Sequence, residues 1–306
     1  MSLWLTPSID RHGELSVVIR RRTLIKGALA GAALFSFPLQ AKTTPRWVIL
    51  DWGITEMALL LGITPVGVAA PDWYRRLFSQ PPLPEQVADV GLLFQPNYET
   101  LFELRPDTLL VTPAHRMAEA QLSRIAPLSY FSTSGPHPWQ QAQQNLHALA
   151  QLAGLRTRAD QVMAGLLQRL ESARQQAVRF KDKPIYLLHP LDTLHVLALG
   201  AGSLFTDVLG LLDLPHHTPF AVGAQGYATL ELEQLTQLPP GWLALLPSWP
   251  EIDLNPVLQS PLWHTLTRSD GHRLLELPDG LSTEGGVLTA VRFAEALVKA
   301  LNEANP

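Results

Sequence analysis

The sequence of 306 residues contains no cysteine. This absence excludes disulfides, iron–sulfur clusters, zinc sites built on thiolates and thiol nucleophiles. It also excludes a lipoprotein anchor, because that lipid is attached to an N-terminal cysteine. Charged residues are few, at 16% of the chain, whereas hydrophobic residues reach 46%, which is enough for a sizeable core.

Motifs typical of catalysis are missing as well. The chain has no G-x-S-x-G elbow, no GxxxxGK[ST] loop and no GxGxxG fingerprint after a strand. Its nearest glycine-rich pieces, residues 200–202 and 285–286, are expected to form a turn and a helix start. The sequence therefore predicts a binding protein and not an enzyme.

Ten histidines raise the question of a metal site. His189 and His195 flank a short turn, and His216 and His217 are adjacent. Zinc sites need three or four ligands on converging faces, and no HxH or HxxxH pair is present. No direct metal site is predicted, and direct zinc or manganese binding is kept as an alternative.

The N-terminus carries a cationic segment, residues 20–26 (RRRTLIK), followed by the apolar run 27–37. That run is far shorter than the roughly 20 residues that a membrane-spanning helix needs, so it indicates a removable signal. The pair Arg21 and Arg22 resembles a twin-arginine export signal, with cleavage expected near Ala41. The alternative is a basic, disordered arm of a cytoplasmic protein.

Removal of this signal makes the chain more acidic. Residues 1–41 hold five Arg or Lys and two acidic residues, a net +3, so the formal charge changes from −4 to −7. An acidic domain is a poor partner for nucleic acid. Because an exported protein without a lipid is best retained behind an outer membrane, the expected location is a Gram-negative periplasm, as a soluble protein.

The remaining residues, about 265 in number, suggest two lobes. Short apolar strand candidates alternate with helical patterns on both sides of one long helical segment, residues 156–178. This order predicts an α/β fold with two parallel-rich α/β lobes joined by one long helix. The ligand cleft is expected between the lobes. The expected boundaries are 1–41 for the signal, 42–154 for the N-terminal lobe, 155–180 for the connecting spine helix and 181–306 for the C-terminal lobe. Within the N-terminal lobe, Asn97 is expected to cap a helix that runs through Leu104.

Several short segments, in order along the chain, resemble the FhuD-like ferric hydroxamate-binding proteins of ABC importers, clamp-type solute-binding proteins with a helical spine. They are residues 59–68 (LLLGITPVGV), 81–84 (PPLP), 89–92 (DVGL), 96–97 (PN), 124–127 (RIAP), 203–205 (SLF), 260–263 (SPLW) and 285–293 (GGVLTAVRF). The resemblance implies a periplasmic protein that binds an iron(III)–siderophore complex, without a cofactor, and delivers it to the inner-membrane permease. A cobalamin or haem carrier of the same fold is the alternative.

The pocket positions of this family are occupied differently here. Where the family has an arginine after the DVGL segment, this sequence has Leu93. The family's tyrosine falls near His115 and Arg116, in a loop one residue shorter, and its tryptophan aligns with Gln225. The ligand class therefore does not follow from these three positions.

Aromatic residues after strand candidates are the first candidates for ligand contact, because a compact iron complex with an apolar periphery needs aromatic walls. Trp52 follows the first strand, Trp73 and Tyr74 follow the second, and Trp249 follows a strand of the second lobe. The carboxyl edge of an open α/β sheet is the usual place for ligands. For Trp73 and Tyr74 the alternative is packing against the proline-rich loop.

Polar candidates lie at the same edges. Arg116 can donate charge-assisted hydrogen bonds to hydroxamate or carboxylate oxygens, and His115 can do so if it is protonated. Gln225 and Tyr227 belong to a glycine-rich turn expected before a helix, where the family places ligand contacts. A solvated surface position is the alternative for Arg116, and a mere connector is the alternative for the turn.

The resemblance also implies one acidic docking residue on each lobe, which pairs with arginines of the permease. Glu119 and Glu233 match that pattern, each near the start of a helix. Both carboxylates also favour a helix N-terminus without any partner. The expected partners are a ferric siderophore, the ABC permease and, during export, the twin-arginine translocase, and the protein is expected to be a monomer.

Overall fold

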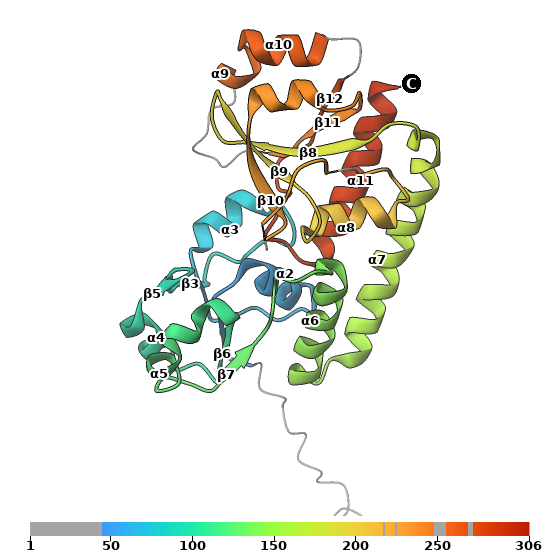
Figure 1. Cartoon of the computed structure of the whole chain (residues 1–306). Helices are drawn as coiled ribbons and strands as arrows, with labels where there is room; N and C mark the ends of the chain where they lie inside the picture. Colours follow the sequence, from blue (N-terminus) through green and yellow to red (C-terminus); the bar gives the residue numbers. More distant parts are fainter. Residues whose placement is uncertain (1–44, 217, 224, 248–254, 269–271, 306) are drawn as a thin grey trace, which may run out of the picture. The chain divides into compact units, whose positions relative to one another are not determined.

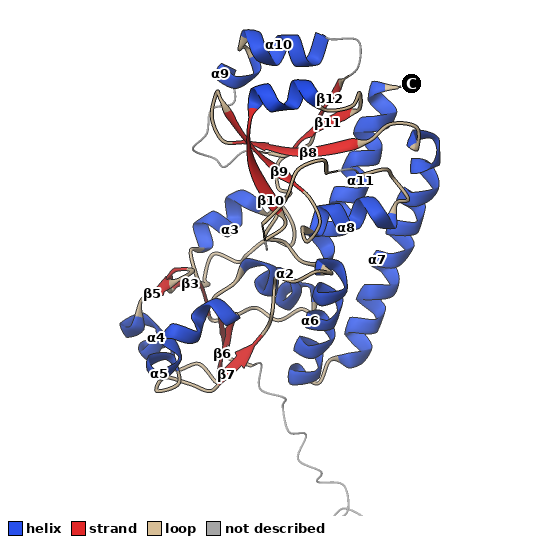
Figure 2. Ribbon diagram, in the orientation of Figure 1, coloured by secondary structure: helices blue, strands red, loops and turns tan. Residues whose placement is uncertain are grey.

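The computed structural model describes residues 45–216, 218–223, 225–247, 255–268 and 272–305. In this part of the chain, strands and helices alternate around two five-stranded sheets and a two-stranded hairpin (Figures 1 and 2). The predicted α/β class, with parallel-rich sheets and a long helix, is confirmed. The predicted signal, residues 1–41 with Arg21 and Arg22, lies outside the described residues.

The first sheet is entirely parallel, in the order β3-β2-β1-β6-β7. Its strands are β1 (Trp47–Ile49), β2 (Gly67–Val68), β3 (Ala88–Asp89), β6 (Thr108–Val111) and β7 (Leu128–Tyr130). They are joined by α2 (Trp52–Leu60), α3 (Pro71–Leu77), the hairpin of β4 (Gly91–Leu92) and β5 (Gln95–Pro96), α4 (Tyr98–Leu104), η1 (Pro113–Ala118) and α5 (Glu119–Leu122). Because parallel strands all end at one edge, the segments that follow them are collected there.

The second sheet is mixed, in the order β10-β9-β8-β11-β12. The strands β8 (Ile185–Pro190), β11 (Trp242–Leu245) and β12 (Arg273–Glu276) are parallel, whereas β9 (His195–Leu199) and β10 (Tyr227–Glu231) add antiparallel pairs. Four further helices belong to this half: α8 (Leu204–Leu211), η3 (Leu232–Gln237), α9 (Asn255–Leu258) and α10 (Pro261–Arg268). The second half is therefore less purely parallel than the first.

Helices α6 (Pro138–Ala153) and α7 (Arg156–Ala177) follow the first sheet, and η2 (Val178–Phe180) leads to the second. The 22 residues of α7 correspond to a length of about 33 Å at 1.5 Å per residue. This helix packs against α6 and against the closing helix α11 (Val287–Ala304) (Figure 1). The predicted long helix is thus present.

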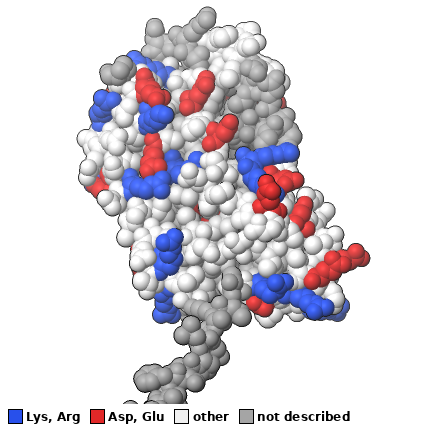
Figure 3. Space-filling view, turned by 180° about the vertical axis from the view of Figure 1, so that it is seen from behind, with Lys and Arg blue, Asp and Glu red and all other residues white. Residues whose placement is uncertain are grey.

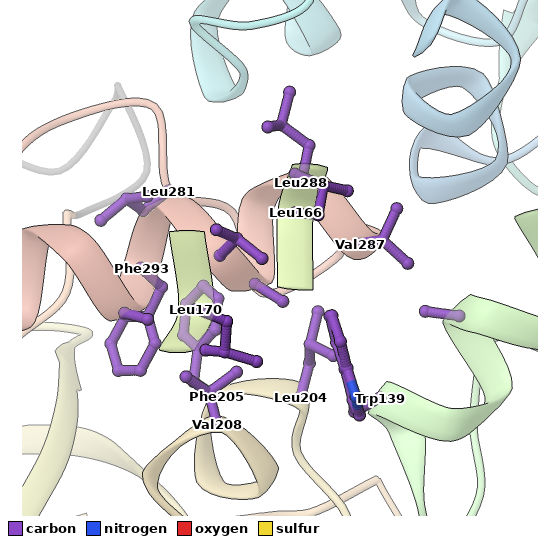
Figure 4. Packing of buried hydrophobic residues seen from close by; sticks show 14 of the residues in the cluster. Trp139, Leu166, Leu170, Leu204, Phe205, Val208, Leu281, Val287, Leu288 and Phe293 are labelled. Carbon is purple, nitrogen blue, oxygen red and sulfur yellow. The ribbon is translucent and has the colours of Figure 1, made fainter. Parts of the chain in front are cut away.

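The largest hydrophobic cluster is built on these helices and takes in residues from both sheets, such as Ile49 and Ile185. Figure 4 shows its centre, where the rings of Phe205 on α8 and Phe293 on α11 stack 4.2 Å apart. Apolar residues of α7, among them Leu166 and Leu170, cover this pair. The core therefore joins elements from the beginning, middle and end of the chain.

One local prediction is wrong and another is confirmed. Gly226 is followed by strand β10 and not by the predicted helix, because residues 227–231 pair with β9. Asn97 does cap α4, since its side chain accepts hydrogen bonds from the backbone of Glu99 and Thr100 at 3.0 and 3.2 Å.

In the described part of the chain, no helix combines the length and the apolar character that a membrane crossing requires. On the face seen in Figure 3, basic and acidic side chains are interspersed and form no large patch of one sign. This face therefore shows no basic stripe of the kind on which nucleic-acid binding depends.

Candidate functional site

The carboxyl edge of the first sheet gathers six of the predicted ligand residues. Strand β1 is followed by Trp52, β2 by Trp73 and Tyr74, β3 by Leu93, and β6 by His115 and Arg116. The order of the strands thus brings together residues that are up to 64 positions apart in the sequence. Their side chains, however, point in different directions.

Trp52 and Tyr74 point into the protein. The indole of Trp52 is buried and donates a hydrogen bond to the carbonyl of Ala69 at 2.9 Å. Tyr74 is fully buried, its ring stacks on Phe78 at 4.5 Å, and its hydroxyl donates to the carbonyl of Pro81 at 3.1 Å. Burial, and secondly the charge of Glu56, raise the pKa of the Tyr74 phenol. The structure shows packing of both rings and no surface for a ligand on Tyr74.

Trp73 and Leu93 lie at the margin of the same apolar cluster, and both are half-buried. The guanidinium of Arg76 lies over the Trp73 ring, 5.9 Å from its centre, which is a cation–π geometry. Leu93 stands in the short connection between β4 and β5 and packs inward. A leucine here supplies packing where an arginine would supply charge.

His115 is buried and makes contacts with two segments of the chain. Its Nε2 lies 2.7 Å from the carbonyl oxygen of Leu93. Its Nδ1 lies 3.1 Å from both the backbone nitrogen and the hydroxyl of Thr112. These bonds occupy both ring nitrogens, so the imidazole holds the chain and offers nothing to a ligand in this conformation.

Arg116 is exposed, and its guanidinium makes no hydrogen bond or ion pair with other described residues. Nearby, the Tyr130 hydroxyl donates a hydrogen bond of 3.0 Å to Glu119. Loss of water, and secondly this bond, raise the pKa of the Tyr130 phenol, while the charge of Arg116 opposes the rise. Arg116 is thus available for a ligand oxygen, and Glu119 is exposed with one neutral partner.

The candidates of the second sheet form a separate group. Gln225 and Tyr227 are both exposed, and the Tyr227 hydroxyl donates to the Gln225 side chain. Between them, Gly226 has φ +79°, and a Cβ there would lie 2.3 Å from the backbone nitrogen of Ser203. Only glycine therefore permits this turn to lie against the loop before α8. Glu233 is exposed on η3, and Trp249 lies outside the described residues.

Two carboxyl groups near the start of α2 were not predicted. Asp51 caps α2 by accepting a hydrogen bond of 2.9 Å from the backbone of Ile54. Burial raises the pKa of Asp51 to about 6, although hydrogen bonds from the backbone of Ile54 and Gly53 and from Thr133 oppose the rise. Glu284 is exposed by surface area. Loss of hydration nevertheless raises the pKa of its carboxyl group, and the charge of Asp51 raises it further. Asp51 is thus close enough to Glu284 for its charge to oppose ionisation of that carboxyl group.

Large apolar side chains are exposed at the same edge and were also missed. Leu92 is 58% exposed and Phe94 69% exposed on the β4–β5 hairpin, and Met117 is 98% exposed on η1. The Phe94 ring lies 5.9 Å from the His115 imidazole. Sequence patterns assign such residues to the core, so no signal in the sequence pointed to their exposure.

A buried carboxylate, Glu56 of α2, holds the N-terminus of α11. It accepts hydrogen bonds from the backbone of Leu288 at 2.9 Å and of Thr289 at 3.3 Å, and from the Thr289 hydroxyl. A Cβ at Gly286 would lie 3.0 Å from its Oε1, so glycine allows the close approach. Burial raises the pKa of Glu56, although these donors oppose the rise.

No group of three or more metal-ligating side chains occurs among the residues that the structure describes. His189 is buried, and burial lowers its pKa, while His195 is held by Asp192 at 2.9 Å. A groove of about 510 Å³ does lie between α7 and α11, beside the Arg169–Glu295 ion pair. It contains none of the predicted site residues.

Residues 48–267 match the family model described as periplasmic binding protein. The Escherichia coli iron(3+)-hydroxamate-binding protein FhuD is 28% identical over 290 residues, which cover 94% of this chain and 98% of that protein. The E. coli Fe(3+) dicitrate-binding periplasmic protein FecB is 24% identical, and the match covers 84% of this chain and 85% of that protein.

A similar fold occurs in the Vibrio cholerae siderophore-binding protein FhuD, whose structure holds Fe3+–Desferal. Its TM-score is 0.78 at 24% identity, and the match covers 86% of this chain and all of the other. The sequence and the fold thus lead to the same group of proteins.

Proposed function

Because the chain belongs to the periplasmic binding protein family, we propose that it is the solute-binding component of an ABC importer and carries a ferric siderophore of the hydroxamate type. The observation that carries this proposal is the similarity to an iron(3+)-hydroxamate-binding protein along nearly the full length of both chains. The iron complex is cargo, so no resident cofactor is involved, and the protein is a receptor and not an enzyme.

The ligand is proposed to bind at the carboxyl edge of the first sheet, in a cleft between an N-terminal lobe (42–154) and a C-terminal lobe (181–306), with residues 155–180 as the connecting spine. The exposed guanidinium of Arg116 supports this site because it can donate to ligand oxygens. From the second lobe, Gln225 and Tyr227 are proposed to add polar contacts, with Trp249 as an aromatic wall.

Delivery is proposed to depend on Glu119 and Glu233, one on each lobe, which would pair with arginines of the inner-membrane permease. Both residues are exposed and lie in the first turn of short helical segments. Two separated contacts act as a bivalent clamp, in which each contact raises the effective concentration of the other.

Export is proposed to use residues 1–41 as a twin-arginine signal, read at Arg21 and Arg22 by the twin-arginine translocase. The mature protein is then a soluble monomer in a Gram-negative periplasm. The paired arginines and the short apolar run after them support this pathway.

A ligand panel tests the proposed function. The mature chain is titrated separately with a ferric trihydroxamate, the iron-free trihydroxamate, cobalamin, haem and zinc, while tryptophan fluorescence is followed and absorption by the ligand is corrected with free tryptophan amide. The expected result is saturable binding of the ferric trihydroxamate, with a Kd near or below about 1 μM, or about −8 kcal/mol.

Each other outcome replaces the proposal with a specific alternative. Saturation by cobalamin or haem alone would make the protein a carrier of that ligand. Saturation by zinc alone would show direct metal binding.

A further inference from the structure

We propose that Met117 is an oxidation site: a hydroperoxide converts its thioether to the sulfoxide, and the added oxygen weakens docking of the protein on the permease. Delivery of the cargo then slows reversibly when peroxide is present. The effect on delivery rests on the proposed function, whereas the oxidation of Met117 does not.

The three methionines among the described residues differ greatly in exposure. Met117 is 98% exposed, whereas Met57 is 1% and Met163 5% exposed. Both buried residues belong to the largest hydrophobic cluster. A peroxide must reach the sulfur atom to transfer its oxygen, so the rate of oxidation to the sulfoxide follows the exposure of the side chain. In the folded protein, Met117 is therefore the methionine that reacts without any local unfolding.

The exposure of Met117 is built into the fold and does not come from a frayed segment. On one side, His115 is buried, and its Nε2 lies 2.7 Å from the carbonyl oxygen of Leu93. On the other side, Glu119 accepts a hydrogen bond of 3.0 Å from the Tyr130 hydroxyl, and η1 continues directly into α5. The Met117 side chain thus projects from a segment that is held at both ends.

The reaction needs the hydroperoxide as its only oxidant. A lone pair of the Met117 sulfur attacks the terminal oxygen of the peroxide, the S–O bond forms and the O–O bond breaks. Sulfur loses two electrons and the peroxide gains them. The proton of the transferred oxygen passes to the leaving oxygen, which departs as water, or as an alcohol from an organic hydroperoxide. Methionine sulfoxide reductases restore the thioether, so the change is reversible.

The position of Met117 connects this chemistry to delivery. Met117 lies two positions before Glu119, the residue proposed to dock on the permease, and both side chains are exposed. Methionine is enriched at protein interfaces, where its flexible apolar side chain adapts to the partner. The sulfoxide carries a polar oxygen, and burying that oxygen without a hydrogen-bond donor costs free energy. Oxidation therefore weakens docking and leaves the buried core unchanged.

Peptide mass spectrometry after brief treatment with hydrogen peroxide tests the oxidation site. In the folded mature protein, Met117 is expected to oxidise at least about tenfold faster than Met57 and Met163, and in urea all three should react at similar rates. Comparable rates in the folded protein would overturn the site, and so would an unchanged preference in urea, because burial would then not be its cause. This readout stands even if the wild type binds no ferric hydroxamate, a result that would remove the proposed function alone.

Three variants test the effect on delivery. Met117→Gln places a polar amide where the sulfoxide would stand, whereas Met117→Leu is apolar and cannot be oxidised at this position. Leu152→Gln is the matched control, because Leu152 is 53% exposed but lies on α6, away from α5 (Figure 1).

Uptake and affinity are measured for each variant. In cells, Met117→Gln is expected to reduce uptake of a ferric trihydroxamate by about threefold or more at unchanged affinity, and the other two variants should stay near the wild type. With spheroplasts, peroxide-treated wild type should deliver less than peroxide-treated Met117→Leu, and methionine sulfoxide reductase should restore delivery. Normal uptake with Met117→Gln overturns the effect on docking, and so does a loss of affinity, since Met117 would then contact the ligand.

Discussion

Replacement of Glu56 by alanine is expected to destabilise the protein by about 3 kcal/mol. The carboxylate accepts hydrogen bonds from the backbone of Leu288 and Thr289 and from the Thr289 hydroxyl, at a buried site. A buried donor left without an acceptor costs about 1 to 3 kcal/mol, and alanine leaves two backbone donors in this state. The gain from removing a buried charge offsets part of the cost.

Glu56→Gln is expected to cost less, about 1 kcal/mol, because the amide oxygen can still accept from α11. The matched control is Glu103→Ala, which removes an exposed carboxylate from helix α4 and should change the free energy of unfolding by less than about 0.5 kcal/mol. Urea unfolding, followed by tryptophan fluorescence and circular dichroism, measures all three variants.

The stability difference between the wild type and Glu56→Gln should also depend on pH, in a direction that packing alone would not produce. The pKa of Glu56 is raised in the folded protein above its ordinary value of 4.5, so the folded state binds this proton more tightly than the unfolded state does. The contribution of this group is then present below pH 4.5 and is lost as the pH rises through the raised value. Glutamine does not titrate, so the advantage of the wild type over Glu56→Gln should shrink as the pH rises from 4.5.

Two results would refute this reasoning. If the free energy of unfolding of Glu56→Ala lies within about 0.5 kcal/mol of the wild-type value, the hydrogen bonds between α2 and α11 contribute nothing to stability. If the difference between the wild type and Glu56→Gln grows with rising pH, the pKa of the buried carboxyl is lowered and not raised.

Three further predictions concern transport. Arg116→Ala should weaken ferric hydroxamate binding by about tenfold or more, since one charge-assisted bond contributes about 1.5 to 3 kcal/mol, and wild-type affinity in titration would leave Arg116 a solvated residue. Changing both Arg21 and Arg22 to Lys should leave precursor in the cytoplasm, and an unchanged periplasmic yield in fractionated cells would remove the twin-arginine proposal. Glu233→Ala, alone and with Glu119→Ala, should reduce uptake by cells at intact affinity, and normal uptake in the double variant would assign both carboxylates to the surface.

Elements with strong local signals could be predicted from the sequence. The long helical pattern became α7, and Asn97 followed by a helical pattern became the capped start of α4. Strand β10 could not be predicted, because residues 227–231 are held by pairing with β9, a contact that is not local in the sequence.

The location of the candidate site could be predicted from the sequence, but the directions of its side chains could not. A residue that follows a parallel strand lies at the carboxyl edge, and this rule gathers Trp52, Tyr74 and His115. The direction of a side chain depends on packing that the rule does not contain, and here Ala69 and Phe78 determine it for the two aromatic residues. The exposure of Phe94 was equally hidden, because a large apolar residue in a short strand has the pattern of a core residue.

The tie between Glu56 and Thr289 also has a consequence for biosynthesis. The two residues are 233 positions apart, and α11, which contributes Thr289, follows all the other described helices in the sequence. A nascent chain that has completed the first sheet still lacks the donors for this carboxylate and the helix that covers the core. Native packing therefore waits until α11 has been synthesised, and any product truncated before α11 would lack both the donors for this carboxylate and the helix that covers the core.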